Sequence, residues 1–424
     1  MRLIAGANTE REVLSSRQRC STCRPTTRPT GAPAEAAYNM TATGSLATAL
    51  ILAMMIVQTL TCPTTICTCS VRGTVICSGK RLERIPYFAR EPGRVYDEID
   101  LSRNEIFAVP PYAFDSVQTR SLVLAHNPLI GVSPRAFAGL GRVLERLDVS
   151  DCELPVLHWA AFRQLSRLVD INLARNSLFA VPRGLFLGLT ALHNLTLASN
   201  RLSSVRHGVF TGLRTLRRLD LSDNVISAIE PGAFEACRQL TTLDLTHNRF
   251  HALDINSFRS LENLQRLSLA SNQLTDVDTG VFFAVRALVE LDLSSNNLTI
   301  IGPKQFSGSP RLERINLAKN AIWNVSVDSF HGLVDMRSVY LDRNRLQTLD
   351  SCLFAGLSRN MELSVSGNPV SCSCDDGRWV DEARTSVTLV GECWEPPARR
   401  GLPLALFNTT SCPSRGTDTQ CRRT

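Results

Sequence analysis

The sequence predicts an α/β solenoid, in which coils of similar sequence stack along one axis and each adds a short strand to one parallel sheet. Three observations predict it. A 24-residue pattern of leucines, such as Leu240 to Asn263, recurs through most of the 424-residue chain. An asparagine returns at a fixed place in nearly every copy, and a phenylalanine follows ten residues after it. Repetition at a fixed period predicts stacked coils that share one continuous core.

The composition is that of an ordered protein and gives little reason to expect a nucleic-acid partner. Apolar and aromatic residues make up 44% of the chain and charged residues 20%, which suits a continuous core. The net charge is +7, but six arginines and three acidic residues lie in the first 60 positions, which leaves 40 basic against 36 acidic residues beyond them. A surplus of +4 is too small to indicate a nucleic-acid-binding protein.

Residues 1–45 are rich in Arg, Ser, Thr and Pro, so we expect a disordered leader. Residues 46–61 hold the apolar run LATALILAMMIVQTL and end in small residues, as a signal peptide does. A run of 15 residues is short for a membrane span of about 20, which favours cleavage after translation from Met40. If translation starts at Met1, the upstream arginines favour an uncleaved signal anchor in the plasma membrane. Either way, the remaining chain is expected to be extracellular.

Residues 62–92 open with four clustered cysteines, which permit three disulfide pairings. A solenoid needs a cover over its first coil, because the apolar edge of the core would otherwise meet water. We therefore predict a disulfide-linked cap. A zinc site is the alternative, but an oxidising compartment disfavours it. The cysteines are Cys62, Cys67, Cys69 and Cys77.

Residues 93–368 hold twelve copies of the pattern and predict twelve coils. The carboxamide of the repeated asparagine both donates and accepts, so it can satisfy backbone groups where the chain leaves each strand. The repeated phenylalanines are predicted to stack into an apolar spine with a structural role. The asparagine ladder consists of Asn104, Asn127, Asn176, Asn200, Asn224, Asn248, Asn272, Asn296, Asn320, Asn344 and Asn368, with Cys152 in one place. The phenylalanine spine consists of Phe114, Phe137, Phe162, Phe186, Phe210, Phe234, Phe258, Phe282, Phe306, Phe330 and Phe354.

The remaining cysteines fall into three groups: buried thiols, cysteines of open pairing and cysteines of a second cap. Cys152, on the ladder, and Cys237, where neighbouring coils have leucine, are predicted to be buried thiols. Cys352 and Cys421 could pair with each other, pair with another chain or stay unpaired. Residues 369–412, which contain NPVSCSCDDGRWV, predict a second cap, and residues 413–424 form a polar tail. The cysteines of that cap are Cys372, Cys374, Cys393 and Cys412.

These features resemble extracellular leucine-rich-repeat proteins. The template L-x-x-L-x-L-x-x-N-x-L is filled in Leu240 to Phe250, and both cysteine clusters resemble the caps of that family. The resemblance implies parallel strands on a concave face, with irregular loops and short helical turns on the convex face. Toll-type receptor ectodomains, Slit-type guidance proteins, lamprey variable lymphocyte receptors and small matrix proteoglycans belong to this class. It also implies four disulfides, Cys62 with Cys69, Cys67 with Cys77, Cys372 with Cys393 and Cys374 with Cys412.

The sequence gives no sign of catalysis. It contains no H-E-x-x-H, G-x-S-x-G or phosphate-binding glycine loop, and we expect no cofactor and no metal site. An enzyme needs acid, base or nucleophile groups that converge, whereas a row of strands spreads its exposed side chains along an arc.

Four N-glycosylation sequons mark surface positions of an extracellular chain. The repeat register places Asn194 on the inner face of the fifth coil, where a sugar would obstruct the middle of the arc. The other three fall on loop, outer or cap positions. They are Asn297, Asn324 and Asn408.

Residues Arg314, Lys319, Arg337, Tyr340 and Arg343 come together on coils ten and eleven and form the candidate ligand site. Aromatic and arginine side chains carry much of the energy of protein interfaces, so we expect a protein ligand here. The alternative is a solvated face on which arginines pair with nearby acids. An acidic glycan such as a sulfated polysaccharide is the second candidate ligand, and its binding would weaken as salt rises.

The sequence thus predicts an extracellular, non-catalytic recognition module that binds an extracellular or cell-surface protein on its concave face. Three other roles fit the same features: a structural component of the extracellular matrix, a non-catalytic subunit of a secreted enzyme, and the ectodomain of a cell-surface receptor. A matrix role predicts binding to fibrils, and a subunit role predicts copurification with a hydrolase. A nucleic-acid partner is not expected, and a membrane contact is expected only through residues 46–60 if they stay uncleaved.

Overall fold

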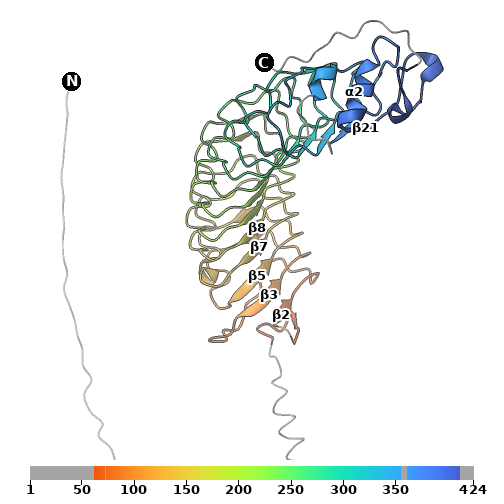
Figure 1. The fold of residues 1–424 in the computed structure, drawn as a ribbon. Coiled ribbons are helices and arrows are strands. Elements are labelled where there is room, and N and C mark those ends of the chain that lie inside the picture. The colour runs from red at the N-terminus through yellow and green to blue at the C-terminus, as the bar shows by residue number, and fades with distance from the viewer. Residues whose placement is uncertain (1–61, 72, 355–360, 411–424) are drawn as a thin grey trace, which may run out of the picture. The chain divides into compact units, whose positions relative to one another are not determined.

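The computed structural model describes residues 62–71, 73–354 and 361–410 of the chain. The predicted leader, signal segment and polar tail, together with Cys412 and Cys421, lie outside the described residues. Within the described part, no helix is both long and apolar enough to cross a bilayer. One sheet of 15 strands runs through it, and Figure 1 shows these strands side by side along one face of the stacked coils.

The long sheet confirms the predicted parallel solenoid. All neighbouring strands are parallel except the first pair, which is antiparallel. In pairing order the strands are β1 (Thr68–Cys69), β2 (Thr74–Ile76), β3 (Tyr96–Asp100), β5 (Thr119–Val123), β7 (Arg146–Asp148), β8 (Asp170–Asn172), β9 (Asn194–Thr196), β11 (Arg218–Asp220), β13 (Thr242–Asp244), β14 (Arg266–Ser268), β15 (Glu290–Asp292), β17 (Arg314–Asn316), β19 (Ser338–Tyr340), β20 (Glu362–Ser364) and β21 (Thr388–Val390).

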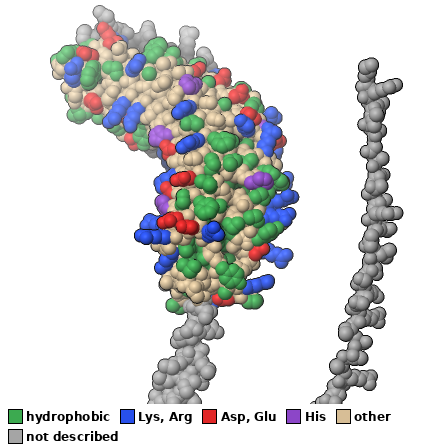
Figure 2. Space-filling view, turned by 180° about the vertical axis from the view of Figure 1, so that it is seen from behind, with side chains coloured by type: hydrophobic (Ala, Val, Ile, Leu, Met, Phe, Trp, Pro, Cys, Tyr) green, Lys and Arg blue, Asp and Glu red, His purple; other side chains and the backbone are tan. Residues whose placement is uncertain are grey.

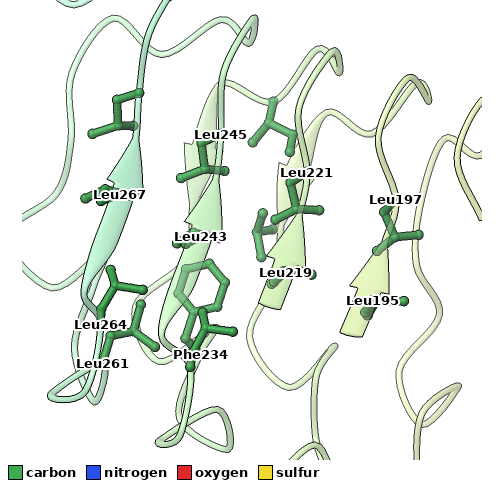
Figure 3. Close-up of a cluster of buried hydrophobic side chains, with 14 of the residues drawn as sticks. Leu195, Leu197, Leu219, Leu221, Phe234, Leu243, Leu245, Leu261, Leu264 and Leu267 are labelled. Carbon is green, nitrogen blue, oxygen red and sulfur yellow. The ribbon is translucent and has the colours of Figure 1, made fainter. Parts of the chain in front are cut away.

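The strands pair in phase, so equivalent side chains of successive coils stack. Leu219 of β11 lies opposite Leu195 of β9 and Leu243 of β13. Because side chains alternate along a strand, the leucines point into the core and the residues between them point outward. Figure 3 shows the strand leucines packed with Phe234 and the leucines of the turns, all of them buried. One continuous core results, to which every coil contributes.

The asparagine ladder joins each coil to the one before it. Asn248 is representative: its Oδ1 accepts the N–H of Ile226, and its Nδ2 donates to the carbonyl of Leu221 in the preceding coil and to that of Leu245 in its own. All eleven asparagines repeat this arrangement. The predicted backbone-satisfying role of the ladder is confirmed. At Cys152 the Sγ donates to two carbonyls instead, those of Leu124 and Ser150.

The phenylalanine spine is buried along its whole length. The Phe210 and Phe234 rings, for example, are stacked with their centroids 5.8 Å apart. The caps extend the spine by one aromatic ring at each end, which the repeat spacing alone did not predict. Phe88 packs against Phe114 at 6.3 Å, and Trp379 stacks on Phe354 at 6.2 Å.

The sides of the coils away from the long sheet contain turns and a few short elements, as predicted for this fold. Three pairs of two-residue strands join adjacent coils there: β4 (Ala108–Val109) with β6 (Gly131–Val132), β10 (Ser204–Val205) with β12 (Ala228–Ile229), and β16 (Ile300–Ile301) with β18 (Asn324–Val325). The short helices are η1 (Ala138–Leu140), η2 (Ser351–Phe354), η3 (Pro397–Arg399) and η4 (Leu404–Leu406), and one α-helix, α2 (Arg378–Ser386), lies in the carboxyl-terminal cap.

Disulfides cover both ends, which confirms three of the four pairings that the resemblance implied. They join Cys62 to Cys69, Cys67 to Cys77 and Cys372 to Cys393. Cys374 and Cys352 are also disulfide-bonded. The partner predicted for Cys374, Cys412, lies outside the described residues. Each cap also adds a parallel strand to the sheet, β2 at one end and β21 at the other, so the edge of the core is covered by backbone as well as by disulfides.

Candidate functional site

The outward side chains of the long sheet form the concave face, and two grooves lie on it. The carboxyl-terminal groove has a volume of about 380 Å³ and runs across β13, β14, β15, β17 and β19. Its lining includes two of the five predicted site residues, Arg314 and Tyr340, with Arg266, Glu290 and Asn316 between and beside them. In-phase pairing positions them, since Asn316 lies directly opposite Tyr340.

The arginines of the carboxyl-terminal groove are paired with carboxylates. Glu290 lies between Arg266 and Arg314 in the register, and its carboxylate pairs with both: Oε2 lies 3.1 Å from Arg266 Nε, and Oε1 pairs with Arg314 Nη2. Beside the groove, Arg337 lies 3.2 Å from Glu313. The arginines of this face therefore pair with nearby acids, as the alternative to a ligand site proposed. The groove presents an aromatic ring among matched charges and is not simply basic.

Lys319 and Arg343 do not line the carboxyl-terminal groove. Each stands one residue before a ladder asparagine, with a left-handed backbone at φ values of 58° and 54°. Their N–H groups donate to the next coil, to the carbonyls of Asp342 and Ser366. Both side chains are exposed at the rim of the concave face. The five predicted site residues therefore share two neighbouring coils but not one groove.

The amino-terminal groove is larger, about 710 Å³, and none of the five predicted site residues lines it. Acidic residues predominate in its lining: Glu98, Asp148, Asp151, Asp170, Asp220 and Asp223, against Arg146 and Arg175. The aspartates that end several of the strands, such as Asp148 and Asp220, were the available sequence signal. Several of these carboxylates serve their own turns, since Asp148 and Asp220 accept the N–H of the residue two positions on.

The sequons lie where the repeat register predicts. Asn194 begins β9 and lines the amino-terminal groove, and its Nδ2 donates to the carboxylate of Asp170. Asn297, Asn324 and Asn408 are exposed and line neither concave groove. A sugar on Asn194 would fill the amino-terminal groove, whereas the other three positions leave the carboxyl-terminal groove open.

The two interior thiols are buried, as predicted, and have no disulfide partner. Burial raises the pKa of Cys152 to about 11 and that of Cys237 to about 12. A raised pKa keeps a thiol protonated and therefore unreactive at neutral pH.

Across the residues that the structure describes, no three His, Cys, Asp or Glu side chains are grouped as metal ligands. Figure 2 shows basic, acidic and apolar side chains interspersed over the face seen from behind.

The parallel sheet, the asparagine ladder and the disulfide-linked caps together define the class of protein: a capped solenoid of short parallel strands. The family model for the leucine rich repeat matches residues 142–202, 190–250, 238–298, 262–322 and 310–370, more than half of the chain. The chain belongs to the leucine-rich-repeat family. No curated protein sequence matches it.

Solved structures resemble the fold at low sequence identity. A chain of the octameric complex of Latrophilin 3, Unc5D and FLRT2 (LRR) has a TM-score of 0.63 and 24% identity over 83% of this chain and 100% of its own length. The Toll–Spatzle complex of Drosophila gives 0.58 and 18% over 74% of this chain and 54% of that one. The TLR13–ssRNA13 complex gives 0.52 and 21% over 74% and 54%. This chain thus spans about half of the Toll and TLR13 chains, and the likeness concerns the fold alone.

Proposed function

We propose that this chain is an extracellular, non-catalytic recognition protein that binds a protein partner in the carboxyl-terminal groove of its concave face. The observation that carries the proposal is the groove itself, in which Tyr340 lies beside Arg314 and Asn316 on in-phase strands. Tyrosine and arginine are enriched among residues that dominate binding energy at protein interfaces. The Toll–Spatzle and FLRT2 structures, which share the fold, are complexes with proteins, and this supports a protein ligand.

The charge pattern of the groove favours a protein over an acidic glycan at this place. Glu290 lies between Arg266 and Arg314, so an approaching polyanion would meet a carboxylate as well as two guanidinium groups. A protein surface can present both signs of charge and an apolar side chain for the tyrosine ring. Disulfides at both ends support an extracellular location, because such bonds persist in oxidising compartments.

The test is a binding screen of the full secreted chain against a panel of purified cell-surface and secreted ectodomains. Replacing Tyr340 and Arg314 together by Ala should weaken binding to any ectodomain found by about 2 kcal/mol or more, roughly 30-fold. A matched control is the replacement of Tyr112 and Arg135 by Ala, because these residues form an exposed Tyr–Arg hydrogen bond of 2.8 Å away from the grooves. Equal affinities for the two double variants would contradict the proposal.

A further inference from the structure

Four exposed arginines gather at the edge of the coils that carry β11 and β13. Arg218 begins β11, Arg217 precedes it, and Arg214 lies in the turn that leads to them. Arg238 occupies the place of Arg214 one coil later, since both stand four residues before the first residue of their strand. Equivalent residues of neighbouring paired strands lie about 4.8 Å apart. We call these four residues the arginine cluster, and they line neither concave groove.

The arginine cluster has no carboxylate partner, unlike Arg266 and Arg314 of the carboxyl-terminal groove. The register explains the difference. Arg266 and Arg314 both lie opposite Glu290, whereas Arg218 lies opposite Asn194 on one side and Thr242 on the other. Among residues 62–71, 73–354 and 361–410, no ion pair involves a member of the cluster.

The neighbours of Arg217 on the adjacent coils are also free of acids. Its N–H donates to the carbonyl of His193, and its own carbonyl accepts the hydroxyl of Thr241 at 3.0 Å. Asp220, the acid nearest in sequence, accepts the N–H and the hydroxyl of Ser222 and so serves its own turn. Arg217 and Arg218 therefore have no acidic neighbour at the equivalent positions of the adjacent coils, and their charge is available to a ligand from solution.

An outer groove of about 670 Å³ continues from the cluster onto the convex turns. Arg214 and Arg238 line it with His207 and Thr211, and Glu235 is the one acid in its lining. Gly208, Gly212 and Gly232 also line it, in left-handed conformations with φ between 77° and 100°. Glycine tolerates this backbone and adds no side chain to the wall. Cluster and groove together make a basic track that passes from the strand edge to the outer turns.

The chemistry of the track indicates its ligand. Guanidinium groups bind sulfate and phosphate oxygens through paired hydrogen bonds. No aromatic side chain other than His207 lines the outer groove, and its only large aliphatic side chain is Leu187, so it lacks the aromatic anchors of a protein interface. A track of separate charges fits a linear polymer that carries an anionic group on successive units. In an oxidising, extracellular setting such a polymer is a sulfated polysaccharide.

We propose that the arginine cluster and the outer groove bind a sulfated glycosaminoglycan. The outer groove shares no lining residue with the carboxyl-terminal groove, so this inference goes beyond the proposed protein recognition; it rests on the proposed extracellular location but not on the protein ligand. A polysaccharide held at this edge leaves the carboxyl-terminal groove open, and the protein can hold both ligands at once.

The test uses the full secreted chain and immobilised heparin as the sulfated probe. One variant carries Arg214→Ser, Arg217→Ser and Arg238→Ser. Its matched control carries Arg266→Ser, Arg314→Ser and Arg337→Ser, which remove the same net charge from arginines that are already ion-paired. At a salt concentration of about 0.15 M the cluster variant should bind heparin at least about tenfold more weakly. The slope of log affinity against log salt concentration should also become shallower by roughly two. The control should stay within about twofold of the unmodified chain.

Three results would overturn the inference: no binding of the unmodified chain to heparin at that salt, an equal loss in both variants, or equal binding to chemically desulfated heparin. Single-stranded DNA of matched length serves as the second probe. Binding to DNA that is as tight as binding to heparin, and that depends on the same arginines, would exclude a sulfated glycan as the specific ligand. Thermal melting of both variants shows whether the fold is retained, which we expect because all four members of the cluster are exposed.

Discussion

Replacing one ladder asparagine by alanine should destabilise the solenoid far more than the loss of an ordinary surface hydrogen bond. Asn248 is 5% exposed. Its Oδ1 is 2.9 Å from the nitrogen of Ile226, and its Nδ2 lies 3.0 Å and 3.1 Å from the carbonyl oxygens of Leu221 and Leu245. Asn248→Ala leaves these three backbone groups without that partner. At about 1 to 3 kcal/mol for each buried unsatisfied group, less where water enters, we expect a loss of roughly 3 to 6 kcal/mol.

The assay is equilibrium urea unfolding of the purified chain with its disulfides intact, combined with hydrogen exchange of the Ile226 amide. The matched control is Asn263→Ala. Asn263 also donates to a carbonyl of the preceding coil, that of Arg238 at 2.8 Å, but it is exposed, so its loss should cost about 1 kcal/mol or less. If the two variants unfold at the same urea concentration and the Ile226 amide exchanges no faster, the structural role assigned to the ladder is refuted.

Three further predictions concern the core and the surface. Phe234→Ala should lower the free energy of unfolding by about 3 to 5 kcal/mol because the ring is fully buried, whereas Phe283→Ala, at a side chain that is 54% exposed, should change the melting temperature little. Cys152 and Cys237 should resist iodoacetamide at pH 8 until the chain is unfolded. Because folding raises their pKa values from 9.0, the protonated thiols contribute their full stability below about pH 9, and this contribution falls as the pH rises toward 11 and 12. Urea titrations at several pH values would detect the fall. Asn297→Gln should remove one glycan from the secreted chain, visible as a mass loss, without changing binding to the ectodomain found in the screen.

The repeated elements of this fold were predictable from the sequence because one period fixes many contacts at once. A 24-residue spacing places Leu195, Leu219 and Leu243 opposite one another, and the same spacing aligns the asparagines and phenylalanines. Pairs such as Arg314 with Glu290 follow from the same arithmetic, since the two residues are 24 positions apart. The aromatic additions by Phe88 and Trp379 were not predictable in this way, because the caps depart from the repeat spacing.

The residue before eleven of the twelve ladder positions had no glycine to signal its backbone conformation, the exception being Gly367 before Asn368. Eleven residues there, among them Lys319 and Arg343, are left-handed although none is glycine. The hydrogen bonds to the next coil hold them, as with the N–H of Lys319 and the carbonyl of Asp342. Tertiary contacts thus override a local preference. The grooves were unpredictable for a related reason, because their depth depends on side-chain conformations across several coils.

A glycan placed in the carboxyl-terminal groove would block a protein partner from the concave face. Arg266→Asn creates a sequon with Leu267 and Ser268 inside the groove. Gln273→Asn creates one at the position that Asn297 occupies a coil later, outside the groove.

Both glycosylated variants are compared with the unmodified chain against the ectodomain found in the screen, after mass spectrometry has verified the added sugar. We predict that the glycan from Arg266→Asn abolishes binding and that the glycan from Gln273→Asn leaves it intact. Undiminished binding by the glycosylated Arg266→Asn chain would show that the partner does not bind in this groove.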